Sequence, residues 1–402
     1  MRELAEAPFL NFFDEAVRSD PAAALEELRR HGSVAQTPIG AMVHGHREAR
    51  ELLVDPRMRA SIMQLVEMQG ITEGPLHDMV ASTVLELDGA DHSRIRRLVT
   101  PALTPKAVAQ HRPLMRELIH GLVDRFAEAG RCEFMGDFAD HYPIEVMCHL
   151  LGVPPEDHER FARWNDVMTW VLSLQLSAHL DEVNEAFEGL FGYISDDLVA
   201  ERRRSPRDDL LGQLIAARDG DDRLSEQELL AMIGAMLFAG YDTTRNQLGV
   251  AMVVFCDHPD QWRILADCPE VVPAAVEELM RAFGVVSTVP RVTNEEIDVD
   301  GWRIPGGSLV SVSVAGANHD PSVYVDPHRF DVSAEREPHL AFGFGAHHCL
   351  GASLARAELQ EALAILARRM LDLALDGESQ WRELTGIAGP TRVPLRFTPA
   401  PA

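Results

Sequence analysis

The chain has 402 residues, of which 46% are hydrophobic and 25% charged, which is the composition of an ordinary globular protein. Its formal net charge of −26 argues against sequence-independent nucleic-acid binding, because that activity normally needs a positive surface. No apolar run approaches the ~18–20 residues that span a bilayer, and the N-terminal stretch lacks the continuous apolar core of a secretory signal. We therefore expect a cytoplasmic protein that binds neither nucleic acid nor membrane.

Most of the chain shows the 3.6-residue periodicity of helices. The predicted helices are, in chain order, 20–31, 47–54, 92–99, 106–129, 143–151, 156–173, 181–203, 225–256, 259–267, 270–282 and 351–371. The clearest strand signal is 301–314, where a Pro-Gly-Gly turn precedes alternating Val and Ser. Residues 316–350 then form a predicted long loop, and loops of this length are more often functional than idle. The pattern predicts a mainly α protein with a small β portion, in one large domain.

The segment 91–116 is basic within an acidic chain. It carries six Lys or Arg residues and one acid, a net charge of about +5 within a protein of net charge −26. His92 and Arg96 lie four residues apart, on one face of a predicted helix, where a solvated basic face is the simplest interpretation. The charge contrast also predicts a patch suited to an acidic partner or ligand.

The helix predicted at 225–256 has strong start signals. Ser225 is placed as the N-cap, Glu228 completes a capping box, and Leu224 with Leu229 forms a hydrophobic staple. A helix ending at residue 256 has ~32 residues and a length of roughly 48 Å. Its first half is apolar on every side, so we expect it to cross the centre of the protein.

The middle of this helix, AGYDTT at 239–244, is unusual. Gly240 costs about 1 kcal/mol relative to Ala in a helix interior, and Asp and Thr are poor helix formers. A threonine can bond back to a carbonyl of the preceding turn and bend the helix without any function. An acid and hydroxyls at the midpoint of a buried helix can instead serve chemistry, and the sequence alone leaves both interpretations open.

Three shorter motifs follow, each uninformative in isolation. Glu278 and Arg281 in VEELMR can pair on one helix face, and exposed pairs of this kind contribute little stability. VPRV at 289–292 contains Arg291, and DPHRF at 326–330 contains Arg329.

The stretch FGFGAHHCLG at 342–351 ends just before a predicted helix. The five cysteines of the chain lack Cys-x-x-Cys spacing, which suits reduced thiols, and Cys349 is by default a small apolar residue. Zinc is disfavoured because adjacent His and Cys residues rarely converge on one tetrahedral ion. A cysteine nucleophile would need a base that the sequence does not locate. What remains is a lone thiolate on a large planar cofactor, haem, to which glycines allow close backbone approach.

The same stretch resembles the haem-binding signature of the cytochrome P-450 family. The matching positions are Phe342, Gly345, His347, Cys349 and Gly351. AGYDTT resembles the family's oxygen-activating helix, and the Glu-x-x-Arg pair and PHRF fall in the family's order and spacing. The matches run from about residue 88 to 356.

The resemblance implies a cytochrome P-450 fold over residues 1–402, with haem b (iron protoporphyrin IX) between the long central helix and the Cys loop. Cys349 would be the axial ligand of the haem iron, Thr243 would hydrogen-bond dioxygen, and Asp242 would relay protons. Ala239 and Gly240 would open a groove for dioxygen. The residues implied at the haem propionates are His92, Arg96, Arg291 and His347. Those implied in a structural cluster are Glu278, Arg281 and Arg329.

The implied activity is a monooxygenase that hydroxylates or epoxidises a small molecule with O2. No flavin or nicotinamide fingerprint occurs, so electrons from NAD(P)H should arrive through a ferredoxin reductase and a ferredoxin, with docking at 91–116. Residues 58–82 and 164–180 are expected at the substrate pocket. The single positions expected there are Met63, Ala235, Phe238, Ser287, Val289 and Ile387. None of these single positions is charged, which predicts a hydrophobic substrate.

Three alternatives remain at this stage. A peroxide-driven relative would usually lack the Asp242–Thr243 pair. A non-catalytic haem sensor or electron carrier would seldom need a proton relay. A thiol hydrolase would use Cys349 as its nucleophile and bind no haem. The four methionines between residues 58 and 79 either adapt a pocket to varied shapes or merely fill a core.

Overall fold

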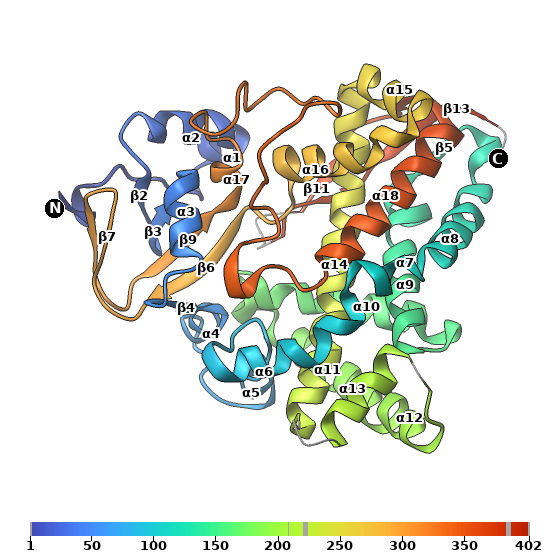
Figure 1. Cartoon of the computed structure of the whole chain (residues 1–402), viewed down its shortest axis with the longest axis horizontal. Helices are drawn as coiled ribbons and strands as arrows, with labels where there is room; N and C mark the ends of the chain where they lie inside the picture. The colour runs from blue at the N-terminus through green and yellow to red at the C-terminus, as the bar shows by residue number, and fades with distance from the viewer. Residues whose placement is uncertain (1, 208, 220–223, 383–386, 401–402) are drawn as a thin grey trace. The chain divides into compact units, whose positions relative to one another are not determined.

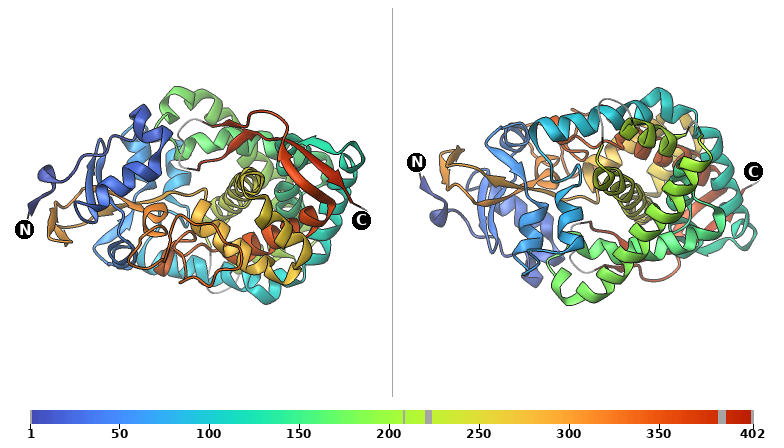
Figure 2. Two further views of the ribbon diagram at one scale, coloured as in Figure 1. Left: turned by 90° about the horizontal axis from the view of Figure 1, so that it is seen from above. Right: turned by 90° about the horizontal axis from the view of Figure 1, so that it is seen from below.

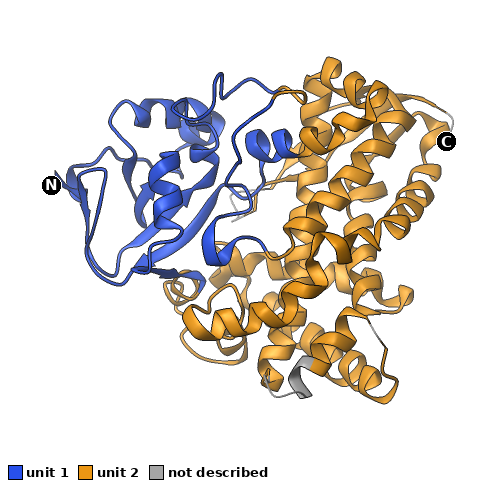
Figure 3. Ribbon diagram, viewed as in Figure 1, with its two compact units in different colours: residues 1–62, 277–330, 335–349 blue, residues 63–276, 331–334, 350–402 orange. Residues whose placement is uncertain are grey.

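The computed structural model describes residues 2–207, 209–219, 224–382 and 387–400. They form two compact units (Figure 3). The first comprises residues 1–62, 277–330 and 335–349, and the second residues 63–276, 331–334 and 350–402. No helix among the described residues is both long and apolar enough to cross a membrane.

The first unit is built on a five-stranded sheet with the strand order β2-β3-β9-β6-β4 (Figure 1). β3 and β9 run parallel, whereas the other neighbours are antiparallel. Valines on these strands, among them Val43, Val310 and Val312, are fully buried in the unit's core. A second, three-stranded sheet has the order β1-β8-β7. The elements are β1 (Arg2–Glu3), α1 (Glu15–Ser19), α2 (Pro21–Arg29), β2 (Val34–Thr37), β3 (Gly40–Val43), α3 (His46–Leu52), β4 (Met58–Ala60), β6 (Thr288–Thr293), β7 (Ile297–Val299), β8 (Trp302–Ile304), β9 (Leu309–Ser313) and α17 (Val314–Ala317).

The second unit is mainly helical, and α14 (Glu226–Asp257) runs through it with other helices of the unit around it (Figure 2). The remaining helices are α5 (Pro75–Ala81), α6 (Gly89–Val99), α7 (Pro105–Ala109), α8 (Arg112–Asp124), α9 (Tyr142–Leu151), α10 (His158–Met168), α11 (Leu180–Tyr193), α12 (Ala200–Arg204), α13 (Leu210–Asp219), α15 (Pro259–Asp267) and α18 (Ala352–Arg369). The unit boundaries fall within α4 (Ile62–Glu67) and α16 (Val272–Phe283). Two small sheets, β10-β13-β5 and β11-β12, complete the unit. Their strands are β5 (Arg131–Glu133), β10 (Met370–Leu375), β11 (Gln380–Trp381), β12 (Pro390–Arg392) and β13 (Pro394–Pro399).

The start of α14 confirms the predicted capping box. The Ser225 hydroxyl accepts a hydrogen bond from the Glu228 amide at 3.1 Å, and the Glu228 carboxylate accepts one from the Ser225 amide at 2.7 Å. The helix has 32 residues, and most side chains of its second half are buried. The mainly α composition and the strand at β9 are confirmed as well. Residues 316–350 contain only the end of α17 and one short 3-10 turn, as the predicted loop requires.

Several predicted helices have different limits in the structure. The helix predicted at 106–129 is wrong, because α7 ends at Ala109 and a new helix, α8, starts at Arg112 with Pro113 in its first turn, where the missing amide costs nothing. The single helix predicted at 181–203 contains a π-helical segment, 194–199, between α11 and α12. The helix predicted to reach residue 371 ends at Arg369, and β10 begins at the next residue.

Most strands had no predicted counterpart. The hairpin of β2 and β3 and the C-terminal strands are two to six residues long, too short for periodicity to distinguish strand from helix or loop. Their pairing partners are often distant: β3 pairs with β9, and β5 pairs with β13. The β portion is therefore larger than the sequence indicated.

A buried histidine in the first unit makes its stability dependent on pH. His44 is 1% exposed, and neither ring nitrogen has a hydrogen-bond partner among the described residues. Burial, with a smaller contribution from Arg29, lowers the pKa of His44 from 6.5 to about 4. The unfolded chain therefore binds a proton that the folded chain refuses between these values, so stability falls as pH falls through this window.

We expect His44→Leu to remove about 2 kcal/mol of the loss in unfolding free energy between pH 6.5 and pH 5. Urea denaturation at both pH values measures the difference. His31→Leu, at an exposed histidine of the same unit, is the control and should leave the pH dependence as it is. An equal pH dependence in wild type and His44→Leu would contradict the assignment.

Candidate active site

The loop that carries Cys349 is closed by backbone hydrogen bonds. The Cys349 amide donates to the Phe342 carbonyl at 2.7 Å, and the His348 amide donates to the Gly345 carbonyl at 3.1 Å. Gly343 and Gly345 have φ values of 70° and 75°, a left-handed conformation that side chains with a Cβ rarely adopt. Cys349 lies exposed at the end of this loop, three residues before α18. The local sequence thus presents a thiol on a rigid turn.

In the second unit, α14 is buried from Ala231 to Met252 except at Gly240 and along one stripe. Ala235, Phe238, Ala239 and Thr243 are partly or fully exposed, whereas the residues around them are mostly buried. The spacing of three and four residues places these side chains on one helix face. This open face lies at the middle of the helix and carries no charged side chain.

Thr243 and Gly240 differ in their surroundings. The Thr243 hydroxyl donates to the Ala239 carbonyl at 2.6 Å, the back-bond expected of a threonine within a helix. The hydroxyl oxygen keeps its lone pairs for a further donor. Gly240 faces α9, where an added Cβ would collide with the Met147 side chain. Close packing of α14 against α9 therefore accounts for Gly240. Of Ala239 and Gly240, Ala239 is the more exposed residue.

Asp242 is fully buried and held by two partners. Its Oδ1 accepts hydrogen bonds from Asn246 Nδ2 and from Arg382 Nη1, both at 3.0 Å. Its Oδ2 has no partner among the described residues. Arg382 also lies 3.6 Å from Asp166 of α10. The acid of the motif is thus ion-paired, with one carboxylate oxygen still open to a further donor.

Asp166, which lies near Arg382, is the partly exposed member of this group of side chains. Its carboxylate accepts a hydrogen bond from the Tyr241 hydroxyl at 3.5 Å, and its side chain is 47% exposed. Burial raises the pKa of Asp166, and the nearby Arg245 and Arg382 oppose that rise. Burial also raises the pKa of Tyr241, so this phenol stays protonated. Arg382 thus links the carboxylates of Asp166 and Asp242 as a shared cation.

In the first unit, Glu278 and Arg281 form a buried ion pair, and both side chains are 1% exposed. Arg281 donates to both carboxylate oxygens of Glu278, at 2.7 and 2.9 Å. It also donates to the carbonyls of Asn318, Pro327 and Arg329. Arg329 therefore meets Arg281 through its backbone carbonyl, and Arg336 lies 3.5 Å from Glu278 as a cation that the sequence motif did not reveal.

The single residues expected at the substrate pocket are divided between the two units and differ in exposure. Ala235 and Phe238 lie on the open face of α14, whereas Met63 and Ile387 are buried in the same unit. Ser287 is exposed and Val289 half-buried in the first unit. The segments 58–82 and 164–180 are joined by Gln69, whose amide donates to the Ser173 carbonyl at 3.0 Å and accepts from the Ser177 amide at 3.3 Å.

Comparison with known proteins identifies the family to which the chain belongs. The cytochrome P-450 family model matches residues 156–379, more than half of the chain. Luteothin monooxygenase of Streptomyces thioluteus is 39% identical over 398 residues, which cover 98% of this chain and 97% of that protein. The chain belongs to the cytochrome P-450 family.

A further relative and a solved structure support the same family assignment. Mycinamicin IV hydroxylase/epoxidase of Micromonospora griseorubida is 40% identical over 324 residues, which cover 79% of this chain and 80% of that protein. The structure of cytochrome P-450 CYP109Q5 from Chondromyces apiculatus superposes with a TM-score of 0.89 at 32% identity, covering 98% of this chain and 100% of that one. The fold is that of a cytochrome P-450, and the protein is a haem-thiolate monooxygenase of the bacterial type.

The residues of this cytochrome P-450 fit haem. A macrocycle brings its own four nitrogen ligands and needs one axial donor from the protein, and Cys349 is a single exposed thiol on a closed loop. In the parts of the chain that the structure describes, no three His, Cys, Asp or Glu side chains gather into a site that the protein alone would complete. The donor chemistry thus matches a prosthetic group rather than a bare ion.

The residues expected at the propionates occupy both units. His347 lies in the short 3-10 turn of the Cys loop, and Arg291 is buried on β6. In the second unit, His92 and Arg96 lie one turn apart on α6, where His92 is buried. Each is a donor of the type that carboxylates need. Their contact with haem remains a prediction.

The basic segment is partly neutralised within the second unit. Arg112 and Arg116 both pair with Glu361 of α18, at 2.7 Å, so two of the six cations already have an acidic partner. Arg94 pairs with Glu228 at the start of α14. Arg97 is exposed on α6. The surface charge of this segment is therefore smaller than its sequence suggested.

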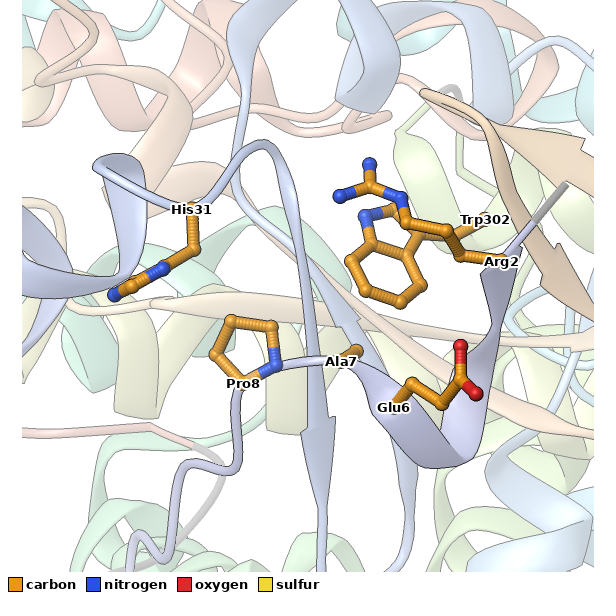
Figure 4. A pocket seen from close by; sticks show the side chains of 6 residues that line it. All are labelled: Arg2, Glu6, Ala7, Pro8, His31 and Trp302. Atoms are coloured by element: carbon orange, nitrogen blue, oxygen red, sulfur yellow. The ribbon is translucent and has the colours of Figure 1, made fainter.

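A cavity of about 550 Å³ in the first unit lies apart from the predicted residues. Its lining is Arg2, Glu6, Ala7, Pro8, His31 and Trp302. In it the Arg2 guanidinium stacks over the indole of Trp302 at 3.8 Å (Figure 4). None of the residues expected to bind haem or oxygen lines this cavity.

Proposed function

We propose that residues 1–402 act as one cytochrome P-450 domain that hydroxylates or epoxidises a hydrophobic small molecule. It uses O2 and electrons passed from NAD(P)H by a ferredoxin reductase and a ferredoxin. The observation that carries this proposal is at the midpoint of α14, where Thr243 presents an accessible hydroxyl on an otherwise apolar face and the next residue along the chain towards the N-terminus, Asp242, is a buried acid. A sensor or electron carrier has no need for such a pair.

Dioxygen activation and O–O cleavage are the chemistry that thiolate-ligated haem supplies when bound. Cys349 Sγ would provide the thiolate, and His92, Arg96, Arg291 and His347 would hold the propionates. Thr243 Oγ1, whose own proton is donated to Ala239, would accept a hydrogen bond at the open face. Asp242 would receive and pass protons at Oδ2, the oxygen that neither Arg382 nor Asn246 occupies.

The substrate is proposed to be an apolar small molecule. The open face of α14 carries only alanine, phenylalanine and threonine side chains, which cannot pair with a charged substrate. The relatives' names, luteothin monooxygenase and mycinamicin IV hydroxylase/epoxidase, point to elaborate small molecules as the class to screen. Shifts in the haem spin state on adding members of such a library would identify ligands.

Replacing Thr243 with alanine tests the oxygen-activating role. We expect Thr243→Ala to keep the thiolate-haem spectrum but to divert most reducing equivalents to hydrogen peroxide, with product formation falling about 10- to 100-fold. Oxygen uptake, peroxide release and product are measured together. Thr100→Ala, at an exposed threonine of the same unit, is the control. Unchanged coupling in Thr243→Ala would contradict the role and favour a peroxide-driven enzyme.

An acidic ferredoxin is proposed to dock on the segment 91–116. Arg97, which is exposed on α6, is the residue chosen for a charge-reversal test. Arg97→Glu is expected to slow reduction by ferredoxin about tenfold at low ionic strength, with a smaller effect at high salt and no change in substrate binding. Stopped-flow reduction measures this, with Arg18→Glu on α1 of the first unit as control. Equal rates at low salt would refute docking at this segment.

A further inference from the structure

The loop that carries Cys349 is anchored to the core of the first unit by an aromatic side chain, Phe344. This side chain is partly buried and packs against the hydrophobic cluster that contains the valines of β3 and β9. Phe344 immediately precedes the 3-10 turn Gly345–His347. The amides of His348 and Cys349 bond to carbonyls within the loop, so these bonds fix its shape, whereas Phe344 fixes it to the core.

The helix α3 makes two further contacts with the same loop. The guanidinium carbon of Arg50 lies 4.4 Å from the centre of the Phe344 ring. Just beyond the end of α3, Val54 lies so close to Gly345 that a Cβ added to this glycine would collide with its Cγ1. The loop is therefore held by the core through Phe344 and by α3 through Arg50 and Val54.

Arg50 is an exposed cation whose contact is with an aromatic ring. In the part of the chain that the structure describes, no acidic side chain forms an ion pair with it, whereas Arg47 on the same helix is paired with Glu48. Holding a long arginine side chain in one place costs conformational entropy. The attraction of the guanidinium to the negative face of the ring offsets this cost and keeps Arg50 over Phe344.

We propose that Arg50 is a positioning residue for Cys349, which clamps Phe344 and so keeps the loop in the conformation that presents the thiolate to haem iron. This inference rests on the proposed role of Cys349 as the axial ligand. Without the clamp the fold would remain, but the loop would open more often as a local unit. The thiolate would then leave the iron more readily, and the red-shifted Soret band of the reduced, CO-treated protein would be lost sooner.

The test uses the haem-loaded protein and two variants at Arg50. Arg50→Gln removes the charge, whereas Arg50→Lys keeps a cation that can lie over the ring. On mild heating, Arg50→Gln is expected to lose the red-shifted band about two- to fivefold faster than wild type, the factor that an exposed cation–π contact supplies. Arg50→Lys should recover most of the difference. Arg2→Gln, which removes the other cation–π contact of the first unit, over Trp302 at 3.8 Å, is the control and should behave as wild type.

Hydrogen exchange separates positioning from a general loss of stability. In Arg50→Gln, the amides of residues 342–349 should exchange faster by a similar factor, whereas those of β9 in the same unit should keep the wild-type rate. A double-mutant cycle assigns the effect to the ring, because Arg50→Gln should cause no further change in a Phe344→Leu background. If Phe344→Leu does not retain haem, the comparison of Arg50→Lys with Arg50→Gln decides.

Equal rates of band loss in wild type and Arg50→Gln, or equal exchange in residues 342–349, overturn the inference. An effect confined to reduction by ferredoxin also overturns it, since Arg50 would then act in partner docking. If either result accompanies a normal CO spectrum in wild type, only the role of Arg50 fails. If wild type itself lacks the red-shifted band, the proposed function fails.

Discussion

Replacing Cys349 with serine is expected to abolish the red-shifted Soret band of the reduced, CO-treated protein. A hydroxyl is a far weaker donor to iron than a thiolate and cannot supply the electron density that favours O–O cleavage. Turnover should fall by more than the ~10–100-fold that loss of an outer-shell contact to a metal ligand typically costs. Absorption spectra of the reduced CO complex and product assays measure both effects.

Cys256→Ser is the matched control. Cys256 lies half-buried near the end of α14, and burial raises the pKa of its thiol to about 12, so it is not a thiolate at neutral pH. Its replacement should leave spectrum and turnover unchanged. A normal CO spectrum in Cys349→Ser would show that another residue ligates the iron and would overturn the assignment of the loop.

Replacing Arg281 with methionine should lower the free energy of unfolding by about 3–5 kcal/mol, because it leaves the buried Glu278 carboxylate without its main partner. Arg281 also satisfies carbonyls of the loop 316–330, which would lose their donor. Urea denaturation followed by tryptophan fluorescence measures the change, and low haem incorporation on expression is a second expected symptom.

The control is a second pair of Glu and Arg, three residues apart on a helix of the same unit. Glu27 and Arg30 on α2 also form an i,i+3 pair, but their side chains are 59% and 73% exposed. Arg30→Met should therefore change the unfolding free energy by less than about 1 kcal/mol. Equal losses in the two variants would mean that burial does not decide the contribution of such a pair.

These two pairs also show what the sequence could predict. Glu-x-x-Arg spacing was sufficient to predict that the side chains meet, because helix geometry is local. It could not reveal that one pair is buried against a loop 37 to 48 residues further along the chain, since burial depends on tertiary packing. The resemblance to a family, not the spacing, marked Glu278 and Arg281 as special.

In α14, too, local features could be predicted from the sequence and tertiary contacts could not. Its start and approximate end were predictable, because a capping box and an apolar run are signals carried by neighbouring residues. The partner of Asp242, by contrast, is Arg382, 140 residues later, and Glu358 reaches Thr244 from α18. No periodicity connects such positions, and an arginine in a C-terminal hairpin has no distinguishing motif. The motif residues were predictable, but their buried partners were not.

The two interactions of Glu228 limit which residues can replace it during evolution. A capping box accepts glutamate or glutamine at this position, so helix formation alone would permit either residue. Because the same carboxylate also binds Arg94 of α6, glutamine would preserve the cap and lose the ion pair. The Glu228 side chain thus contributes both to the first turn of α14 and to the contact with α6. Substitution at residue 228 is therefore limited by two requirements.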